Sequence, residues 1–217
     1  MDRRKSRTSI KPPGIPKALP LAELPHDLPA DGETYERLEY QHLDFGGQVL
    51  VRPHFAEVIF THLIAPTSQV HEVRMEDVRF VGCNLANATW VTLSCVRAEF
   101  SGSRLTGWIA QHATFRDTVF HDCQLDLAQF FGAQMHQVRF DDCPLAGVDF
   151  READVSGVVF ARCDLTNADF RGAKLAGADL RGCTIDGMRV GPDELRGARV
   201  DEVQALALVR AMGIIVE

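Results

Sequence analysis

Residues 168–182 read ADFRG-AKLAG-ADLRG, which are three successive copies of one five-residue unit. Each copy begins with alanine, has a large apolar residue in third place and ends with glycine. A repeat of fixed period is the signature of proteins that stack one structural unit many times. The same unit extends in both directions from this stretch, and it determines the expected fold.

The large apolar residue recurs at every residue number divisible by five. From Tyr40 to Val200 this series holds 33 residues, and all of them are apolar, although only 46% of the chain is. A helix repeats every 3.6 residues and a strand every two, so neither alone explains the pattern. Small or β-branched residues gather two places before the central residue. Glycine gathers two places after it, as expected for a turn that needs backbone freedom.

A second period of twenty residues is superimposed on the first. Every fourth central residue belongs to one column, which reads Phe60, Phe80, Phe100, Phe120, Phe140, Phe160 and Leu180. Identical side chains at this interval indicate coils of twenty residues stacked on one another. Stacked strands lie about 4.8 Å apart, so about eight coils would form a rod roughly 40 Å long.

These residues resemble the pentapeptide-repeat family, whose unit is A-(D/N)-(L/F)-x-x. The resemblance is clearest over residues 73–190 and implies an all-β fold, the right-handed quadrilateral β-helix with four repeats per coil. We expect this β-helix over residues 37–200. Residues 1–36 hold six of the ten prolines and a basic cluster. They are expected to form a disordered arm, with 21–31 packing along the first coil.

Residues 201–217 are expected to form a C-terminal helix and strand that cap the last coil or form a dimer. The helix would start at the acidic Asp201 and stop at Gly213. One stripe of it is apolar, comprising Val203, Leu206, Val209 and Met212. The tail resembles that of mycobacterial fluoroquinolone-resistance members of the family, in which it makes the dimer. The resemblance therefore implies a homodimer through the C-terminus.

The sequence contains no residue spacing typical of a catalytic site or a metal site. Five cysteines share one inner column, at Cys83, Cys123, Cys143, Cys163 and Cys183. Their spacings are multiples of twenty, unlike the short paired spacings of zinc sites, so we expect buried thiols used for packing. His121 should lie one coil from Asp141 as a surface ion pair. We expect no enzyme activity, no metal and no cofactor.

The charge distribution bears on the possible partners. The net charge is −7, but residues 1–20 carry +5, so the remaining residues carry 17 basic against 29 acidic groups, or −12. This acidity argues against direct binding of nucleic acid phosphates by the body. No apolar run is long enough to span a membrane, and prolines interrupt any apolar stretch of a secretory signal. We expect a cytoplasmic protein without membrane contact.

Two surfaces are candidates for binding a protein partner. The first is acidic and comprises Asp141, Asp142, Asp149, Glu152, Asp154, Asp164, Asp169 and Asp179. Some members of the family imitate duplex DNA with such a surface and inhibit or protect DNA gyrase. Duplex DNA carries about one charge per 1.7 Å, so a rod of about 40 Å would need roughly twenty-four, twice the net charge of this body.

The second candidate surface is apolar. Val91, Ile109 and Phe131 are expected on one face of neighbouring coils, either as a contact site or tucked inward by irregular coils. The sequence leaves two functions open. One is a DNA-like rod that engages gyrase, and the other is a scaffold for an unknown protein partner.

Overall fold

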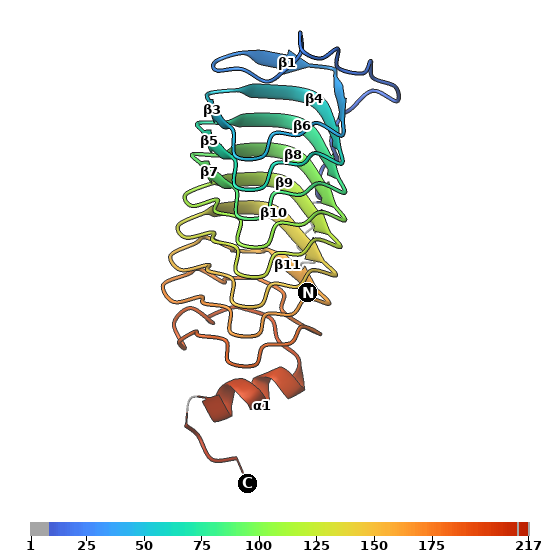
Figure 1. The fold of residues 1–217 in the computed structure, drawn as a ribbon. Coiled ribbons are helices and arrows are strands. Elements are labelled where there is room, and N and C mark those ends of the chain that lie inside the picture. The colour runs from blue at the N-terminus through green and yellow to red at the C-terminus, as the bar shows by residue number, and fades with distance from the viewer. Residues whose placement is uncertain (1–8, 212, 217) are drawn as a thin grey trace.

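The computed structural model describes residues 9–211 and 213–216, and in it the chain winds into a single column of stacked coils (Figure 1). The predicted β-helix is confirmed. Its strands are β1 (Thr34–Glu36), β2 (Glu39–Gln41), β3 (Val49–Val51), β4 (His54–Thr61), β5 (Gln69–His71), β6 (Arg74–Val81), β7 (Thr89–Val91), β8 (Ser94–Ser101), β9 (Thr114–His121), β10 (Gln134–Asp141) and β11 (Val159–Ala161). One helix, α1 (Glu202–Ala211), follows the coils.

Strand pairing follows the twenty-residue period. Every paired strand is parallel, and Phe60 pairs with Phe80, which pairs in turn with Phe100. The larger sheet has the order β1-β4-β6-β8-β9-β10-β11, with β2 beside β4, and the smaller sheet has the order β3-β5-β7. Isolated bridges continue the same offset as far as the pair Asp179 and Arg199. The coil length read from the sequence is therefore the length that the backbone adopts.

The core is a set of side-chain columns parallel to the rod axis. Rings of the phenylalanine column from Phe60 to Phe160 lie nearly parallel, with centroids 4.6–5.2 Å apart. This is close to the spacing of neighbouring strands in a sheet, so each ring rests on the one below it. All of these rings are buried, as are the small residues two places before them.

The turns lie where the glycines are concentrated. Gly172 has φ of 74°, and non-glycine residues in the same slot also have positive φ, for example Asn167 at 58° and Asp142 at 54°. Glycine adopts this left-handed conformation without steric cost, and asparagine and aspartate tolerate it better than most residues. The polypeptide therefore turns at the end of each five-residue unit, which produces the four-sided coil.

The N-terminal arm differs from the expectation of disorder. Residues 9–36 are ordered against the coils, whereas Arg3, Arg4, Lys5 and Arg7 lie outside the described residues. Leu21 forms a parallel bridge with Glu39, and the Tyr40 hydroxyl donates a 2.7 Å hydrogen bond to the Asp27 carbonyl. The open end of the solenoid offers backbone and aromatic groups that bind the segment.

The C-terminal helix begins with a reciprocal cap. The Gln204 backbone amide donates to the Asp201 carboxylate at 3.0 Å, and the Asp201 backbone amide donates to the side-chain oxygen of Gln204 at 2.9 Å. This is the capping-box arrangement of a helix start. Residues 214–216 form no strand in the structure, since a strand needs a partner and this single chain supplies none there. Within the described ranges, no helix is long and apolar enough to cross a membrane.

Candidate functional site

The acidic candidates lie on all four sides of the coil rather than on one. Bridges place Asp149 beside Asp169, Asp154 beside Lys174 and Asp164 beside Thr184. These positions differ by five or ten residues within a twenty-residue coil, so each pair faces a different direction. Asp179 lies on the side of Asp141, because both flank the phenylalanine column. The structure therefore brings together only Asp141 with Asp142, and Asp149 with Asp169.

Most of these carboxylates are already paired with cations of the same chain. The pairs are Asp141 and Asp142 with Arg162, Asp149 with Arg151, Asp154 with Lys174, Asp169 with Arg171 and Asp179 with Arg181. Asp164 instead accepts a hydrogen bond from the Thr166 amide at 2.9 Å. Within the described part of the chain, Glu152 has no ion-pair partner. The acidic surface is thus largely a network of ion pairs.

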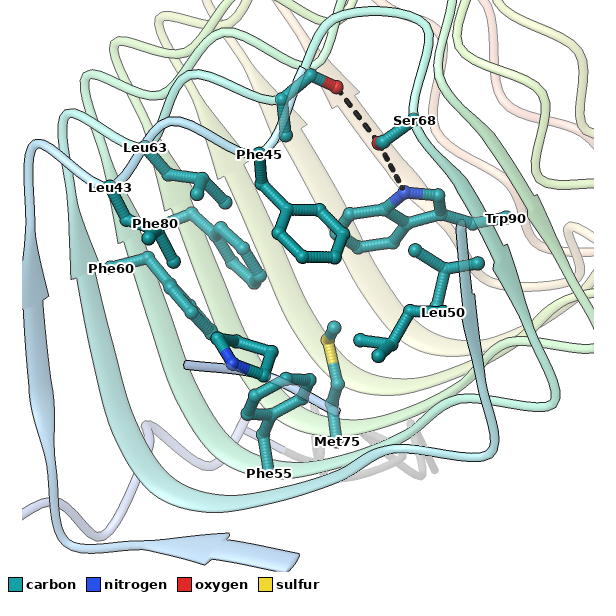
Figure 2. Close-up of a pocket in the computed structure, with 13 residues that line it drawn as sticks. Leu43, Phe45, Leu50, Phe55, Phe60, Leu63, Ser68, Met75, Phe80 and Trp90 are labelled. Carbon is teal, nitrogen blue, oxygen red and sulfur yellow. Dashed lines mark hydrogen bonds between the residues drawn. The ribbon is translucent and has the colours of Figure 1, made fainter. Parts of the chain in front are cut away.

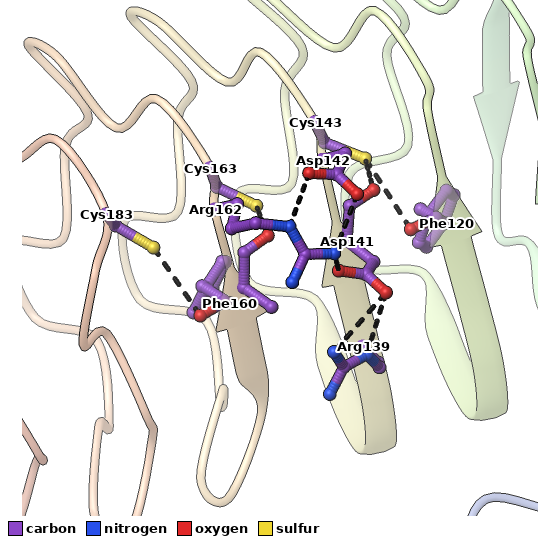
Figure 3. A network of polar contacts seen from close by, with 10 residues as sticks. Phe120, Arg139, Asp141, Asp142, Cys143, Phe160, Arg162, Cys163 and Cys183 are labelled. Carbon is purple, nitrogen blue, oxygen red and sulfur yellow. Dashed lines mark hydrogen bonds and ion pairs between the residues drawn. The ribbon is translucent and has the colours of Figure 1, made fainter.

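The densest part of this network surrounds Arg162 (Figure 3). Its guanidinium donates to both carboxylate oxygens of Asp142, at 2.6 and 2.7 Å, and also to Asp141. Arg139 approaches Asp141 from the other side, at 3.3 Å. The bidentate hydrogen bonds from Arg162 hold the pKa of Asp142 below its usual range. Asp142 therefore stays charged but is neutralised locally by Arg162.

His121 lies one coil from Asp141, as the sequence predicted. Potential ligand atoms of His121, Asp141 and Asp142 lie within 4.8 Å of one another. Arg162 already donates to both carboxylates, however, and a guanidinium competes with a metal ion for the same oxygens. The ion pairs of this cluster join the two aspartates to arginines, and among the described residues His121 forms none, so the predicted pair of His121 with Asp141 is not formed.

The cysteine column is part of the core. Cys123 and Cys143 donate thiol hydrogen bonds to the carbonyls of Phe100 and Phe120, at 3.3 and 3.5 Å. Cys183 makes the equivalent bond to the Phe160 carbonyl, at 3.4 Å (Figure 3). All six cysteines are free and buried. Burial raises the pKa of the Cys83 thiol to about 11 and that of Cys123 to about 12, so both are protonated and unreactive at neutral pH.

The apolar candidates do share one side of the rod. Thr89, Ile109 and Gln129 are bridged in succession, which places Val91, Ile109 and Phe131 on neighbouring coils of that side. Val91 is 37% exposed, whereas Ile109 and Phe131 are half-buried. The Phe131 ring meets His112 edge to face, with centroids 5.4 Å apart, and Arg151 lies 5.7 Å above it. The side chains are thus neighbours, but two of them are partly covered.

The C-terminal helix leaves its apolar stripe uncovered. Val203 is 79% exposed and Leu206 is 37% exposed, while Val209 is half-buried. Met212 lies outside the described residues. Beyond the helix, Ile215 is 86% exposed. The predicted dimer surface is therefore apolar and free of contacts with the rest of the described chain over much of its area.

The core has a small internal cavity near its N-terminal end (Figure 2). It has a volume of about 30 Å³ and is lined by apolar side chains of the first coils and by Pro29 of the N-terminal arm. Trp90 stands at its edge and donates a hydrogen bond to the Ser68 hydroxyl at 3.4 Å. The space is at the scale of a single water molecule, far below the several hundred Å³ of a small-molecule site. It is a packing defect of the core.

Comparison with known proteins identifies the repeat. A family model described as "Pentapeptide repeat region" matches residues 93–170 and 113–190. The chain is a pentapeptide-repeat protein. A search of curated proteins gives no match to it.

Several solved structures are similar to this pentapeptide-repeat protein. Trypsin-treated QnrB1, a plasmid-mediated fluoroquinolone resistance protein, is 15% identical, with 85% of this chain and 100% of that chain covered and a TM-score of 0.43. HetL from Nostoc sp. strain PCC 7120 is 15% identical over 73% and 89% of the two chains, with a TM-score of 0.32. A thylakoid-lumen protein of Arabidopsis thaliana is 25% identical over 51% and 73%, with a TM-score of 0.36.

One set of contacts was missed by sequence reasoning. The arm docks on Asp77 and Asp117, which occupy the same turn slot two coils apart and belong to neither candidate surface. The repeat pattern fixes where these carboxylates point but contains no information about what lies against them. No signal in the sequence could have paired them with residues 9–20.

Proposed function

We propose that this pentapeptide-repeat protein is a non-catalytic binding protein of the cytoplasm that engages DNA gyrase as a DNA-like rod and modulates or protects it. The support is the straight stack of coils with carboxylates repeated along it, for which Asp149 directly above Asp169 is the best example. Some members of the family act on gyrase in this way. The body also carries the required sign of charge, −12 outside residues 1–20.

The intramolecular ion pairs do not prevent such binding. Arg151 and Arg171 are half exposed, and surface pairs of this kind are worth about 0–1 kcal/mol each. A cationic groove that normally holds DNA can therefore compete with these arginines for Asp149 and Asp169. Long-range attraction depends on the net charge, which pairing leaves unchanged.

A supercoiling assay with purified gyrase, with and without a quinolone, tests the proposal. We expect micromolar protein to inhibit supercoiling or to raise the quinolone concentration needed for inhibition. The double substitution Asp149→Asn and Asp169→Asn should weaken the effect about tenfold, since two charge-assisted contacts are lost. Glu33→Gln with Glu36→Gln is the matched control, because it removes the same charge from the first coil. No effect of the unaltered protein at micromolar concentration would remove gyrase as the partner.

The alternative function is a scaffold for another protein partner. Its support is the cluster of Val91, Ile109 and Phe131 on one side of the rod. Phe131→Asp should abolish capture of a partner from the native cell extract under this alternative. Leu127→Asp is the control, since Leu127 is 63% exposed on another side of the coil.

We also propose that the protein is a homodimer through its C-terminus. The uncovered stripe of Val203 and Leu206, with Ile215 beyond it, supports this, because exposed apolar clusters mark contact surfaces. Sedimentation should give twice the chain mass, and Leu206→Asp should give the single-chain mass. Leu127→Asp should leave the dimer intact. A single-chain mass for the unaltered protein would overturn the proposal.

A further inference from the structure

Residues 9–20 lie along the side of the solenoid and climb it from the middle to the first coil (Figure 1). The Lys11 amide donates to Asp117 at 3.0 Å, and the Gly14 amide donates to Asp77 at 2.6 Å. Leu21 then bridges to Glu39 in the first coil. The arm therefore runs opposite to the direction in which the coils are added.

The distance between two backbone amides of the arm matches the distance between the two carboxylates that they contact. Lys11 and Gly14 are three residues apart, which is one turn of a polyproline II helix and a rise of about 9.3 Å. Asp77 and Asp117 are two coils apart, or about 9.6 Å at the spacing of stacked strands. Pro12 and Pro13 lie between the two amides and favour that helix. The amides of Lys11 and Gly14 can therefore reach two carboxylates that lie two coils apart.

The surface beneath the arm is formed by the turn slot of three successive coils, Asp77, Arg97 and Asp117, which we call the arm seat. Asp77 and Asp117 have φ of 54° and 52°, so the same local geometry presents both carboxylates. Arg97 lies on the coil between them and holds both oxygens of Asp77, at 2.7 and 2.6 Å. The carboxylate that receives Gly14 is therefore held in place before the arm arrives.

Asp117 is the more telling residue of the arm seat. It is only 5% exposed, yet within the described residues no cationic side chain pairs with it. This exposed fraction is that of Asp117 with the arm in place, so the arm contributes to the burial of the carboxylate. In the structure the Lys11 amide is its hydrogen-bond donor. Asp117 thus uses its carboxylate for the arm and not for a cation of its own coils, which makes it part of the surface on which the arm docks.

The arm fits the seat through its backbone and its small residues. Ile10, Pro13 and Ile15 are half-buried, whereas Lys11 and Gly14 are exposed apart from their amides. A Cβ atom at position 14 would approach the Asp77 carboxylate to 3.3 Å, so glycine permits the close contact. Recognition thus depends on two backbone amides three residues apart, and hardly on charged side chains.

We propose that the arm seat is a binding site for an extended, proline-containing peptide segment, and that residues 9–19 of this chain are its resident ligand. The segment docks reversibly on the seat of its own chain and can be supplied in trans by the same segment of a second copy. This is a peptide-binding function of the solenoid side, separate from the acidic and apolar surfaces described above.

A fluorescein-labelled peptide of residues 9–20 tests the site by fluorescence polarisation on the full-length chain. In the variant Lys11→Pro with Gly14→Pro, the arm stays extended but loses both donor amides, so the seat is vacated. We expect the peptide to bind this variant at least about tenfold more tightly than the unaltered protein, whose tethered arm competes at high effective concentration. Lys11→Ala is the matched control, because it keeps the amide and should behave as the unaltered protein does.

Two further measurements complete the test. Asp117→Ala in the vacated variant should reduce peptide binding about tenfold or more. A peptide with proline at both donor positions should fail to bind the vacated variant. This measurement needs no change in the solenoid. Equal binding by the vacated and unaltered proteins, or binding of the proline-substituted peptide as tight as that of the natural one, would overturn the proposal. Independently, we expect the Gly14 amide hydrogen to exchange slowly with solvent in the unaltered protein and faster in Lys11→Pro.

Discussion

Phe120 shows at the scale of one residue how the rod is held together. Its ring lies between those of Phe100 and Phe140, with both centroid distances 4.8 Å, and it is fully buried. Phe120→Ala removes the ring from a column that cannot collapse, because the strands above and below keep their spacing. We expect a loss of about 3–5 kcal/mol in the free energy of unfolding, measured by denaturant titration.

The control for this substitution is Arg116→Ala, which lies on the same strand β9 with its side chain exposed. It should change the unfolding free energy by no more than about 0.5 kcal/mol. A loss below about 1 kcal/mol for Phe120→Ala would mean that the column is not the stabilising element described here.

Asp169 carries the pH dependence of the surface network. The Arg171 guanidinium, with Arg189 nearby, holds the pKa of its carboxyl below the usual value. A group whose pKa is lowered in the folded state stabilises the protein above its unfolded pKa of about 4. It loses that contribution as the pH falls through the folded pKa. Asp169→Asn keeps the shape and the acceptor for the Arg171 amide but removes the charge.

We therefore expect Asp169→Asn to lower the unfolding free energy by about 0.5–1 kcal/mol at pH 7 and to match the unaltered protein near pH 2. Urea titrations across this pH range measure the difference. A difference that stays constant with pH would show that the ion pair is not its source.

Gln204 attaches the C-terminal helix to the solenoid at the scale of one element. It is 5% exposed, and its side-chain amide donates to the carbonyls of Leu180 and Cys183, both at 2.7 Å. The Leu180 carbonyl also accepts a hydrogen bond from the Cys183 backbone amide at 3.1 Å, whereas the Gln204 side chain is the donor recorded for the Cys183 carbonyl. Gln204→Leu therefore leaves the Cys183 carbonyl without this donor, which costs about 1–3 kcal/mol if the group stays buried.

The helix should consequently detach before the coils unfold. We expect the backbone amides of α1 to exchange with solvent at least about tenfold faster in Gln204→Leu, while the amides of β9 are unchanged. Arg210→Ala, at an exposed position of the same helix, should leave exchange near its original rate. Unchanged exchange in Gln204→Leu would show that other contacts hold the helix.

The elements that the sequence predicted well are those that repeat. A single turn slot is ambiguous, but its recurrence every five residues fixes the direction of each side chain, and the twenty-residue column fixes the register. The start of α1 was predictable for a different reason, because Asp201 and Gln204 form a local cap. Both kinds of signal are contained within a short stretch of chain.

The contacts that the sequence did not predict join distant segments without a repeat. Nothing local links Lys11 to Asp117, and the prolines of the arm are as compatible with disorder as with docking. The ion pairs of the acidic candidates were missed for a related reason. Asp142 meets Arg162 only because the coils stack, and a sum of charges treats the two as independent.

At the scale of the whole molecule, the gyrase proposal treats the rod as a surface that replaces DNA. Its net charge outside residues 1–20 is −12, and much of its acidity is arranged in pairs that can exchange partners. Attraction of this kind must weaken as salt screens it, over a distance of about 10 Å at 0.1 M. The same dependence is not expected of the apolar scaffold alternative.

Displacement of a fluorescent DNA duplex from gyrase by this protein, measured at increasing ionic strength, tests the central claim most directly. We predict that micromolar protein releases the duplex at low salt. The concentration needed should rise with salt, and it should rise further for Asp149→Asn with Asp169→Asn. If the duplex stays bound at low salt in the presence of micromolar protein, the rod does not compete for the DNA site and the proposed function is contradicted.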